Sequence, residues 1–381
     1  MRNLSIENIL KKLISFKSIS GSSNLSIVEY LEDLAKSLGF RTHRLVNPHN
    51  AQQANLLCEI GPSNQDGLML CGHLDVVPVA GQDWQSDPFV LTSKEDKYIG
   101  RGVLDMKGFI ASCFNALSSL NLNTIKNPLS LLFTYDEENG CHGSKQASID
   151  LNKFLELMPK SVLIGEPTDF GIIRMHKGHI SISLDIIGKP FHSSMPDRGI
   201  SAIKILNRAL NALFDLEKEL INEVVMPEFF ERPFVVMNVG VIHAGNAINI
   251  VPERAQALIG IRPLPQTNTQ ELFRRIHEAI FRANYEYQSH ISLKIMDEVA
   301  ALFCQEHTML ENYLKPLANV SYKPAVDFAT DGGNLAKTGM DCLIFGPGSI
   351  SVAHTANEWI YKKDLALASN KLQELMHKML F

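Results

Sequence analysis

The sequence predicts an α/β protein in which helices cover a mostly parallel sheet, with a small α+β domain inserted into the chain. Its 381 residues exceed what one hydrophobic core usually organises, so two domains are expected. Short runs that are apolar throughout recur in the outer parts of the chain, as in strands buried on both faces of a sheet. Beyond about residue 178, apolar and polar residues alternate instead, as in strands with one face in water.

The outer parts of the chain supply the elements of the larger domain. Ile6–Ile14 has the apolar spacing of an amphipathic helix, and a second helix runs from about Ser26 to Gly39. Further helices are expected at Gly108–Leu120 and Ser144–Leu157. The buried strands are predicted at Leu68–Cys71, Leu129–Phe133, Ser161–Ile164 and Cys342–Phe345.

The inserted domain is expected at residues 178–297, which leaves residues 1–177 and 298–381 for the larger domain. Its elements follow the order strand, helix, strand, strand, helix, strand of a ferredoxin-like fold. They are predicted at Ile180–Ile186, Ile200–Leu220, Phe234–Val241, Ala255–Ile261, Thr269–Tyr285 and Ile291–Met296.

Composition excludes several classes of function. The net charge is −5 and lysine and arginine do not cluster, which argues against nucleic acid as a partner. No apolar run approaches the roughly 20 residues that cross a bilayer, and the N-terminus lacks the features of a secretory signal. The six cysteines are scattered, without a C-x-x-C pair, which favours reduced thiols in the cytoplasm over disulfides or a thiolate zinc site.

Polar side chains follow the ends of the predicted strands, where ligands of open α/β sheets collect. His73 and Asp75 follow Leu68–Cys71 and point to the same side of an extended chain. His73 could therefore bind a metal while the Asp75 carboxylate accepts a hydrogen bond from its other ring nitrogen. Taken alone, a structural buried histidine is the alternative.

Asp105 lies between a glycine-rich segment, Gly100–Gly102, and the predicted helix that begins at Gly108. A carboxylate at this junction could simply cap the helix. It could also bridge two cations, because each of its oxygens can bind one.

Two acidic segments and a second histidine follow the remaining strands. Glu137 and Glu138 face opposite ways on an extended chain, so one could bind a metal while the other acts as general base; a solvated turn is the alternative. Glu166 ends a buried strand, where an unpaired carboxylate is costly. His354 follows a loop rich in glycine and proline, and a surface histidine is the alternative there.

Together these residues form a ligand set of nitrogen and oxygen atoms without thiolate. Such a set suits zinc, cobalt or manganese in catalytic sites. Two divalent ions carry +4, against −3 from the three carboxylates, and the remaining positive charge would acidify a water and attract an anionic substrate. The proposed ligands are His73, Asp105, Glu138, Glu166 and His354.

The five motifs, in this order, resemble the co-catalytic dinuclear zinc amidohydrolases, a family that includes aminoacylase, glutamate carboxypeptidase, succinyl-diaminopimelate desuccinylase and acetylornithine deacetylase. The resemblance spans about residues 10–375 and implies a zinc-exopeptidase-like catalytic domain with a lid that mediates dimerisation. It implies two Zn²⁺ ions, for which Co²⁺ or Mn²⁺ could substitute. His73 and Glu166 would hold one ion, Glu138 and His354 the other, and Asp105 would bridge them.

The resemblance also implies roles for residues that bind no metal. Glu137 would be the general base and Asp75 the partner of His73. His192 matches a lid histidine that reaches the site of the partner subunit in family dimers and stabilises the oxyanion. Asn249 and Arg262 match lid positions that engage the substrate carboxylate, with a loop cap and a surface salt bridge as the alternatives.

Within the family, three segments resemble the acetylornithine deacetylase branch: residues 135–141, 176–179 and 346–354. They imply hydrolysis of an N-acyl amino acid, with N-acetylornithine in arginine biosynthesis as the leading substrate. Two departures are Gly260, where an aspartate is expected, and the segment at residues 329–333. Alternatives are a succinyl-diaminopimelate desuccinylase, a metallo-carboxypeptidase or dipeptidase, and a non-enzymatic metal-binding dimer.

Overall fold

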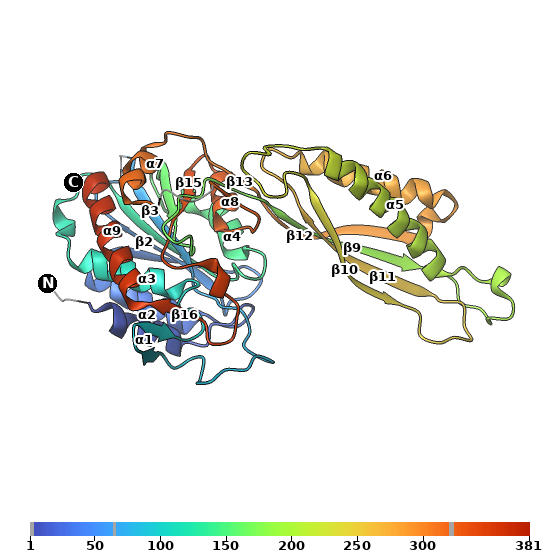
Figure 1. Ribbon diagram of the computed structural model, residues 1–381, viewed down its shortest axis with the longest axis horizontal. Helices are drawn as coiled ribbons and strands as arrows, with labels where there is room; N and C mark the ends of the chain where they lie inside the picture. The colour runs from blue at the N-terminus through green and yellow to red at the C-terminus, as the bar shows by residue number, and fades with distance from the viewer. Residues whose placement is uncertain (1–3, 64–65, 320–323) are drawn as a thin grey trace. The chain divides into compact units, whose positions relative to one another are not determined.

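The structure is a computed structural model that describes residues 4–63, 66–319 and 324–381. The chain forms two compact units (Figure 1). The first contains the chain up to Met175 together with Leu302–Pro324 and Thr330–Phe381, and the second contains His176–Ala301 and Ala325–Ala329. Within the described residues, no helix combines the length and the apolar character that crossing a membrane requires.

A six-stranded sheet forms the centre of the first unit, in the order β1-β2-β6-β3-β7-β15. The strands β3, β6, β7 and β15 run parallel, whereas β2 is antiparallel to β6 and β1 is antiparallel to β2. The parallel strands are the four apolar runs predicted from the sequence, so the prediction of a mostly parallel sheet is confirmed. The strands are β1 (Arg41–Val46), β2 (Ala54–Ile60), β3 (Leu68–His73), β6 (Leu129–Thr134), β7 (Ser161–Ile164) and β15 (Asp341–Ile344).

The strands β1 and β2 are not among the predicted elements. β1 lies at the edge of the sheet and most of its side chains are at least partly exposed, so it contains no apolar run. β2 contains the polar residue Asn55, which is fully buried. Its side chain tolerates burial because it donates a hydrogen bond to the carbonyl of Gly143 at 2.8 Å. A buried polar residue with a distant partner weakens the local pattern on which strand prediction depends.

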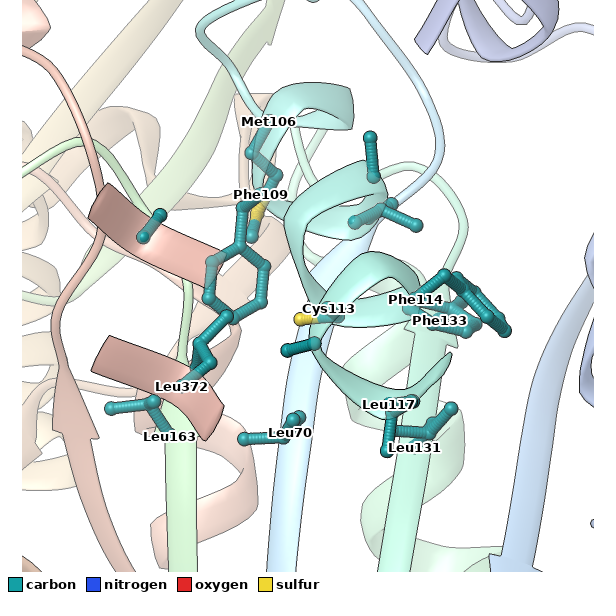
Figure 2. Close-up of a cluster of buried hydrophobic side chains, with 14 of the residues drawn as sticks. Leu70, Met106, Phe109, Cys113, Phe114, Leu117, Leu131, Phe133, Leu163 and Leu372 are labelled. Carbon is teal, nitrogen blue, oxygen red and sulfur yellow. The ribbon is translucent and has the colours of Figure 1, made fainter. Parts of the chain in front are cut away.

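Helices cover this sheet, and α3 shows why they pack there. Nearly all of its side chains are buried, as expected of a helix that is apolar all round. In Figure 2, Leu117 lies beside Leu131 of β6, and Phe109 lies on the side of α3 toward Leu163 of β7. The helices of this unit are α1 (Ile6–Ser15), α2 (Leu25–Ser37), α3 (Lys107–Ser118), α4 (His142–Asp150), α7 (Met309–Leu314), α8 (Asp331–Ala336) and α9 (Lys362–Leu380).

Helix α4 differs from the sequence-based expectation, and α7, α8 and α9 were not predicted. The predicted helix Ser144–Leu157 is too long, because α4 ends at Asp150 and a single 3₁₀ turn, Leu151–Lys153, follows. Beyond that turn Phe154 packs against the ring of His43 instead of continuing an apolar face, with ring centroids 5.0 Å apart. The C-terminal helix α9 was not predicted, although its buried residues Leu365, Leu372 and Met376 have helical spacing.

A small antiparallel sheet in the same unit has the order β16-β5-β4. It pairs Ile99 at the end of β5 with Trp359 at the start of β16. The loop that leads to Asp105 therefore begins beside the segment that follows His354. The strands are β4 (Thr92–Lys94), β5 (Lys97–Ile99) and β16 (Trp359–Tyr361).

The second unit is an antiparallel sheet in the order β10-β11-β9-β12, with α5 and α6 on one face (Figure 1). Ile180, Ile182 and Leu184 of β9 are buried, and Ser181 and Asp185 on the other face are partly exposed, although Ser183 of that face is buried. The elements are β9 (His179–Ile187), α5 (Ala202–Asn222), β10 (Val236–Ala244), β11 (Arg254–Arg262), α6 (Thr269–Ala283) and β12 (Ile291–Val299). The short strands β8 (Met175–His176), β13 (Leu302–Phe303) and β14 (Ala325–Val326) lie where the chain passes from one unit to the other.

Candidate metal centre

The ends of three neighbouring parallel strands carry four of the predicted site residues. His73 is the last residue of β3, Glu137 and Glu138 follow the end of β6, and Glu166 follows the end of β7. Because β3 lies between β6 and β7, the carboxyl ends of all three meet at one edge of the sheet. This edge is where open α/β sheets bind their ligands.

Loops deliver the other two predicted ligands. Asp105 lies two residues before Lys107, the first residue of α3. His354 lies in the loop between β15 and β16, with a backbone φ of 61°. Both loops belong to the first unit.

The carboxylate of Asp105 contacts a different histidine with each of its oxygens. Its Oδ1 lies 2.9 Å from Nε2 of His73, and its Oδ2 lies 3.2 Å from Nε2 of His354. Asp105 and His73 are both buried, whereas the side chain of His354 is half exposed. This is the arrangement that a carboxylate shared between two cations requires.

Glu138 and Glu166 complete the two sides of this arrangement. Oε1 of Glu138 lies 2.9 Å from Nε2 of His354, and Oε1 of Glu166 lies 3.7 Å from Nε2 of His73. Among the described residues, two sets of three side chains could each hold a cation, because the possible ligand atoms within each set lie within 4.8 Å of one another. One set is His73, Asp105 and Glu138, and the other is His73, Glu137 and Glu166. The structure thus brings all five predicted ligands, and Glu137, to one place.

The orientation of His73 corrects one expectation. We predicted that the Asp75 carboxylate accepts the hydrogen bond of the second ring nitrogen, but Nδ1 lies 2.9 Å from the Asp75 carbonyl and 3.7 Å from its Oδ1. A carbonyl only accepts hydrogen bonds, so Nδ1 carries a hydrogen, and Nε2 is the ring nitrogen that faces Asp105. The Asp75 carboxylate instead accepts hydrogen bonds from the backbone N–H groups of Glu137 and Glu138, at 3.0 and 3.2 Å, and from Ser20 Oγ at 2.7 Å.

The proximity of so many acids changes the pKa of several groups. Burial, and the neighbouring Asp105, raise the pKa of Glu138 to about 6. Burial also raises the pKa values of Glu137 and Glu166 well above their ordinary range, with further contributions from nearby carboxylates. Hydrogen bonds that His354 donates to the carboxylates of Asp105 and Glu138 raise the pKa of His354 to about 10. Every one of these shifts favours additional positive charge at this site.

The donor set fits divalent cations. Five carboxylates and two imidazoles converge, and a cluster of acids this deep in a protein is stable only when positive charge compensates it. Nitrogen and oxygen donors without thiolate are the ligands that zinc, cobalt and manganese accept in catalytic sites. The acids are Asp75, Asp105, Glu137, Glu138 and Glu166, and the imidazoles are those of His73 and His354.

Asp331 is a further acid close to this site and was not among the predicted site residues. It is buried at the start of α8, and its Oδ2 accepts a hydrogen bond from Thr134 Oγ1, at the end of β6, at 2.5 Å. Burial raises its pKa, although hydrogen bonds from Thr134 and Ser144 oppose the shift. The sequence signal that could have found it is an aspartate beside Thr330, whose hydroxyl caps this helix.

His192, Asn249 and Arg262 lie in the second unit. His192 is exposed, and its Nδ1 lies 2.7 Å from Ser194 Oγ. The exposed Asn249 lies beside it, because its carbonyl accepts a hydrogen bond from the backbone N–H of Ser193 at 3.1 Å. Arg262 is the last residue of β11 and is half-buried. The predicted roles of these three residues stay predictions.

Comparison with curated proteins finds relatives over nearly the whole chain. This chain is 32% identical over 360 residues to an acetylornithine deacetylase from Photorhabdus laumondii, and the match covers 92% of this chain and 91% of that protein. It is 31% identical over 380 residues to an acetylornithine deacetylase from Buchnera aphidicola, covering 97% of both. An acetylornithine deacetylase from Pasteurella multocida is 33% identical over 339 residues, covering 89% of this chain and 87% of that protein.

Solved structures share the fold at lower sequence identity. An M20 family metallo-carboxypeptidase from Sulfolobus solfataricus superposes with a TM-score of 0.78 at 20% identity, covering 98% of both chains. A tripeptidase from Staphylococcus aureus gives a TM-score of 0.77 at 19% identity, covering 98% of this chain and 97% of that one. The model of peptidase family M20/M25/M40 matches residues 69–378. The chain therefore belongs to peptidase family M20/M25/M40.

Proposed function

We propose that this protein is a dinuclear metal-dependent amidohydrolase that converts N-acetylornithine to ornithine and acetate. The observation that carries the proposal is the Asp105 carboxylate, whose two oxygens face two different histidines within a cluster of acids. The substrate is supported by relatives named acetylornithine deacetylase, which match the chain at 31–33% identity. A neighbour in fold from Bacillus subtilis is described as a dinuclear metal-binding peptidase.

In this proposal, His73 and Glu166 would hold one ion, Glu138 and His354 would hold the other, and both ions would share Asp105. When bound, the two ions supply Lewis acidity at the acyl carbonyl and make the attacking water more acidic. We assign Zn²⁺ as the ion, with Co²⁺ or Mn²⁺ as substitutes, because the donors are imidazole and carboxylate.

Glu137 moves the proton in the proposed reaction. Its carboxylate takes a proton from the attacking water, the resulting hydroxide adds to the acyl carbon, and Glu137 returns the proton to the leaving amine as the C–N bond breaks. The Asp75 carboxylate positions Glu137 by accepting the hydrogen bond of its backbone N–H at 3.0 Å. The thiol of Cys141, 3.6 Å from Glu137 Oε1, limits where that carboxylate can turn.

Substrate choice is tested by measuring amine release from acylated amino acids by the Zn²⁺- and Co²⁺-loaded protein. We expect kcat/KM for N-acetylornithine to exceed that for N-succinyl-diaminopimelate and for dipeptides by about tenfold or more, since the acyl group and the side chain contact different parts of a pocket. A higher kcat/KM on the succinyl substrate would assign the chain to that sister reaction. Metal-loaded protein that releases no amine from any substrate would favour a non-enzymatic metal-binding dimer.

We further propose that residues 178–297 form a lid through which the protein dimerises. In the second unit, β10 is an edge strand with exposed Val241 and Ile242, and Ile248 in the loop that follows is fully exposed. Exposed apolar side chains on an unpaired strand edge favour coverage by a partner. In that dimer, His192 would reach the partner's site and stabilise the oxyanion, and Asn249 and Arg262 would contact the substrate carboxylate.

The role of His192 is tested by mixing His192→Ala with Glu137→Ala subunits. If His192 acts across the dimer, each hybrid has one intact site, and mixing should restore about a quarter of wild-type activity, since half of the dimers are hybrids. Each variant mixed with itself is the control, and differently tagged subunits confirm the exchange. Exchange without any recovery would mean that each subunit uses its own His192.

Cellular context follows from the same chemistry. All six cysteines lie among the described residues and are buried, and none forms a disulfide, which suits a reducing compartment. We therefore propose that the protein acts in the cytoplasm, where release of ornithine would serve arginine biosynthesis.

A further inference from the structure

Glu358 is a buried carboxylate whose two oxygens are both fully used, although it lies outside the proposed ligand set. Its side chain is 1% exposed. Oε1 accepts hydrogen bonds from the backbone N–H groups of Leu104 and Asp105, at 2.9 and 3.1 Å. Oε2 accepts from the backbone N–H of Gly102 at 3.0 Å and from Arg101 Nη1 at 2.8 Å. One side chain thus holds the backbone of the loop that presents Asp105.

The backbone of Glu358 holds the start of the same loop. Its carbonyl accepts a hydrogen bond from the N–H of Gly100 at 3.0 Å. Within the loop, Gly102 has a φ of 84°, and a Cβ there would lie 2.8 Å from Val76 Cγ1, so the chain must pass close to its neighbours. A tight loop with several inward-facing N–H groups needs one acceptor that can serve them all, and the Glu358 carboxylate is that acceptor.

A second branch of the same network reaches His354. Arg101 is 1% exposed, and its Nη2 donates a hydrogen bond to Gln82 Oε1 at 2.5 Å. Gln82 in turn donates from Nε2 to the backbone carbonyl of His354 at 2.8 Å. Glu358 itself follows His354 by four residues. The network therefore contacts the backbones of Asp105 and His354, two of the three residues proposed to hold the second ion.

We propose that Glu358 is a positioning residue for the dinuclear centre, which holds the backbone of Asp105 directly and that of His354 through Arg101 and Gln82. This inference rests on the proposed function. In this role, Glu358 fixes the separation of Asp105 and His354, where Oδ2 of Asp105 lies 3.2 Å from Nε2 of His354. Groups that orient metal ligands commonly change metal affinity or activity by 10- to 100-fold when they are replaced.

The decisive variant is Glu358→Gln, which keeps the size of the side chain. A carboxylate only accepts hydrogen bonds, whereas an amide has one accepting oxygen and one NH₂ group. The NH₂ group would face two of the N–H donors that the carboxylate now satisfies, so one side of the Asp105 loop would lose its partner. We expect the loop, and with it Asp105, to shift relative to His354.

The experiment titrates metal-free protein with Co²⁺, by calorimetry and by visible absorption, and then measures kcat and KM. For Glu358→Gln we expect the second Co²⁺ to bind about 10- to 100-fold more weakly than in the wild type. We also expect an altered visible spectrum and a lower kcat with little change in KM. A variant that binds two Co²⁺ ions with wild-type affinity, spectrum and kcat would overturn the inference.

The matched control is Glu311→Gln. Glu311 is also a buried carboxylate of the first unit, but its partners are the backbone N–H of His307 and the cations of Arg174 and Lys315. The Glu311→Gln variant should have a lower melting temperature, because it weakens these contacts, but it should bind Co²⁺ as the wild type does. Equal losses of Co²⁺ affinity in both variants would show a general effect of buried acids and would overturn the inference.

Gln82→Ala decides the matter if Glu358→Gln does not fold, because Gln82 lies in a partly exposed loop. We expect its second-ion affinity to fall below that of the wild type. Unchanged Co²⁺ affinity in a folded Gln82→Ala protein would then refute the link to His354. If the wild type itself binds fewer than two Co²⁺ ions, the proposed function fails, and that result differs from a failure confined to the variants.

Discussion

An Asp105→Asn variant is expected to lose catalytic turnover by a factor on the order of 10⁴, because two-metal Lewis acidity contributes several kcal/mol to the transition state. The amide keeps the shape of the side chain, but its NH₂ group cannot bind a cation or accept a hydrogen bond. Because the two oxygens of Asp105 lie 2.9 and 3.2 Å from the Nε2 atoms of His73 and His354, one of the two sides must lose its ligand.

Metal content provides the independent readout for Asp105→Asn. After dialysis against buffered Zn²⁺, the wild type should retain two ions per chain and the variant at most one. Asp341→Asn is a suitable control, since Asp341 is a partly exposed aspartate whose carboxylate lies 3.7 Å from Lys160 Nζ. It is the first residue of β15 and pairs with the first residue of β7, so it lies at the opposite end of these strands from the centre. Retention of two ions and of wild-type turnover by Asp105→Asn would remove the bridging role.

A Glu137→Ala variant is expected to keep both metal ions while kcat falls by about 10²–10⁴, the usual contribution of a general base. The structure makes this experiment necessary, because Glu137 also belongs to a group with His73 and Glu166 whose ligand atoms lie within 4.8 Å of one another. As a ligand it would be needed for metal binding, and as a base it would not.

The metal stoichiometry of Glu137→Ala therefore separates the two roles. Two bound ions with greatly reduced kcat would identify the base. Loss of one ion would place Glu137 among the ligands instead, and wild-type kcat would exclude it from the mechanism. Glu137→Gln is the matched comparison, because it retains the side-chain volume and can still accept a hydrogen bond but cannot take up a proton.

Local patterns in the chain predicted the fold class and the candidate ligands. The run Ser161–Ile164, apolar after its first residue, is β7 with the same bounds, because a strand buried on both faces leaves a nearly continuous apolar signal. The rule that parallel strands present their carboxyl ends at one edge then predicted that His73, Glu138 and Glu166 would meet. Both inferences use only the order of residues along short segments.

The contacts that position those ligands were not predictable in this way. Glu358 lies 253 residues along the chain from Asp105 and accepts a hydrogen bond from its backbone N–H. Asp331 lies 197 residues from Thr134 and accepts a hydrogen bond from its hydroxyl. Asp75 was assigned to the ring of His73, yet its carboxylate holds the backbone of Glu137. Periodicity is a property of neighbouring residues, so it indicates which face of a strand or helix is buried. Which distant donor meets which acceptor depends on strand order and loop packing, and these exist only once the chain has folded.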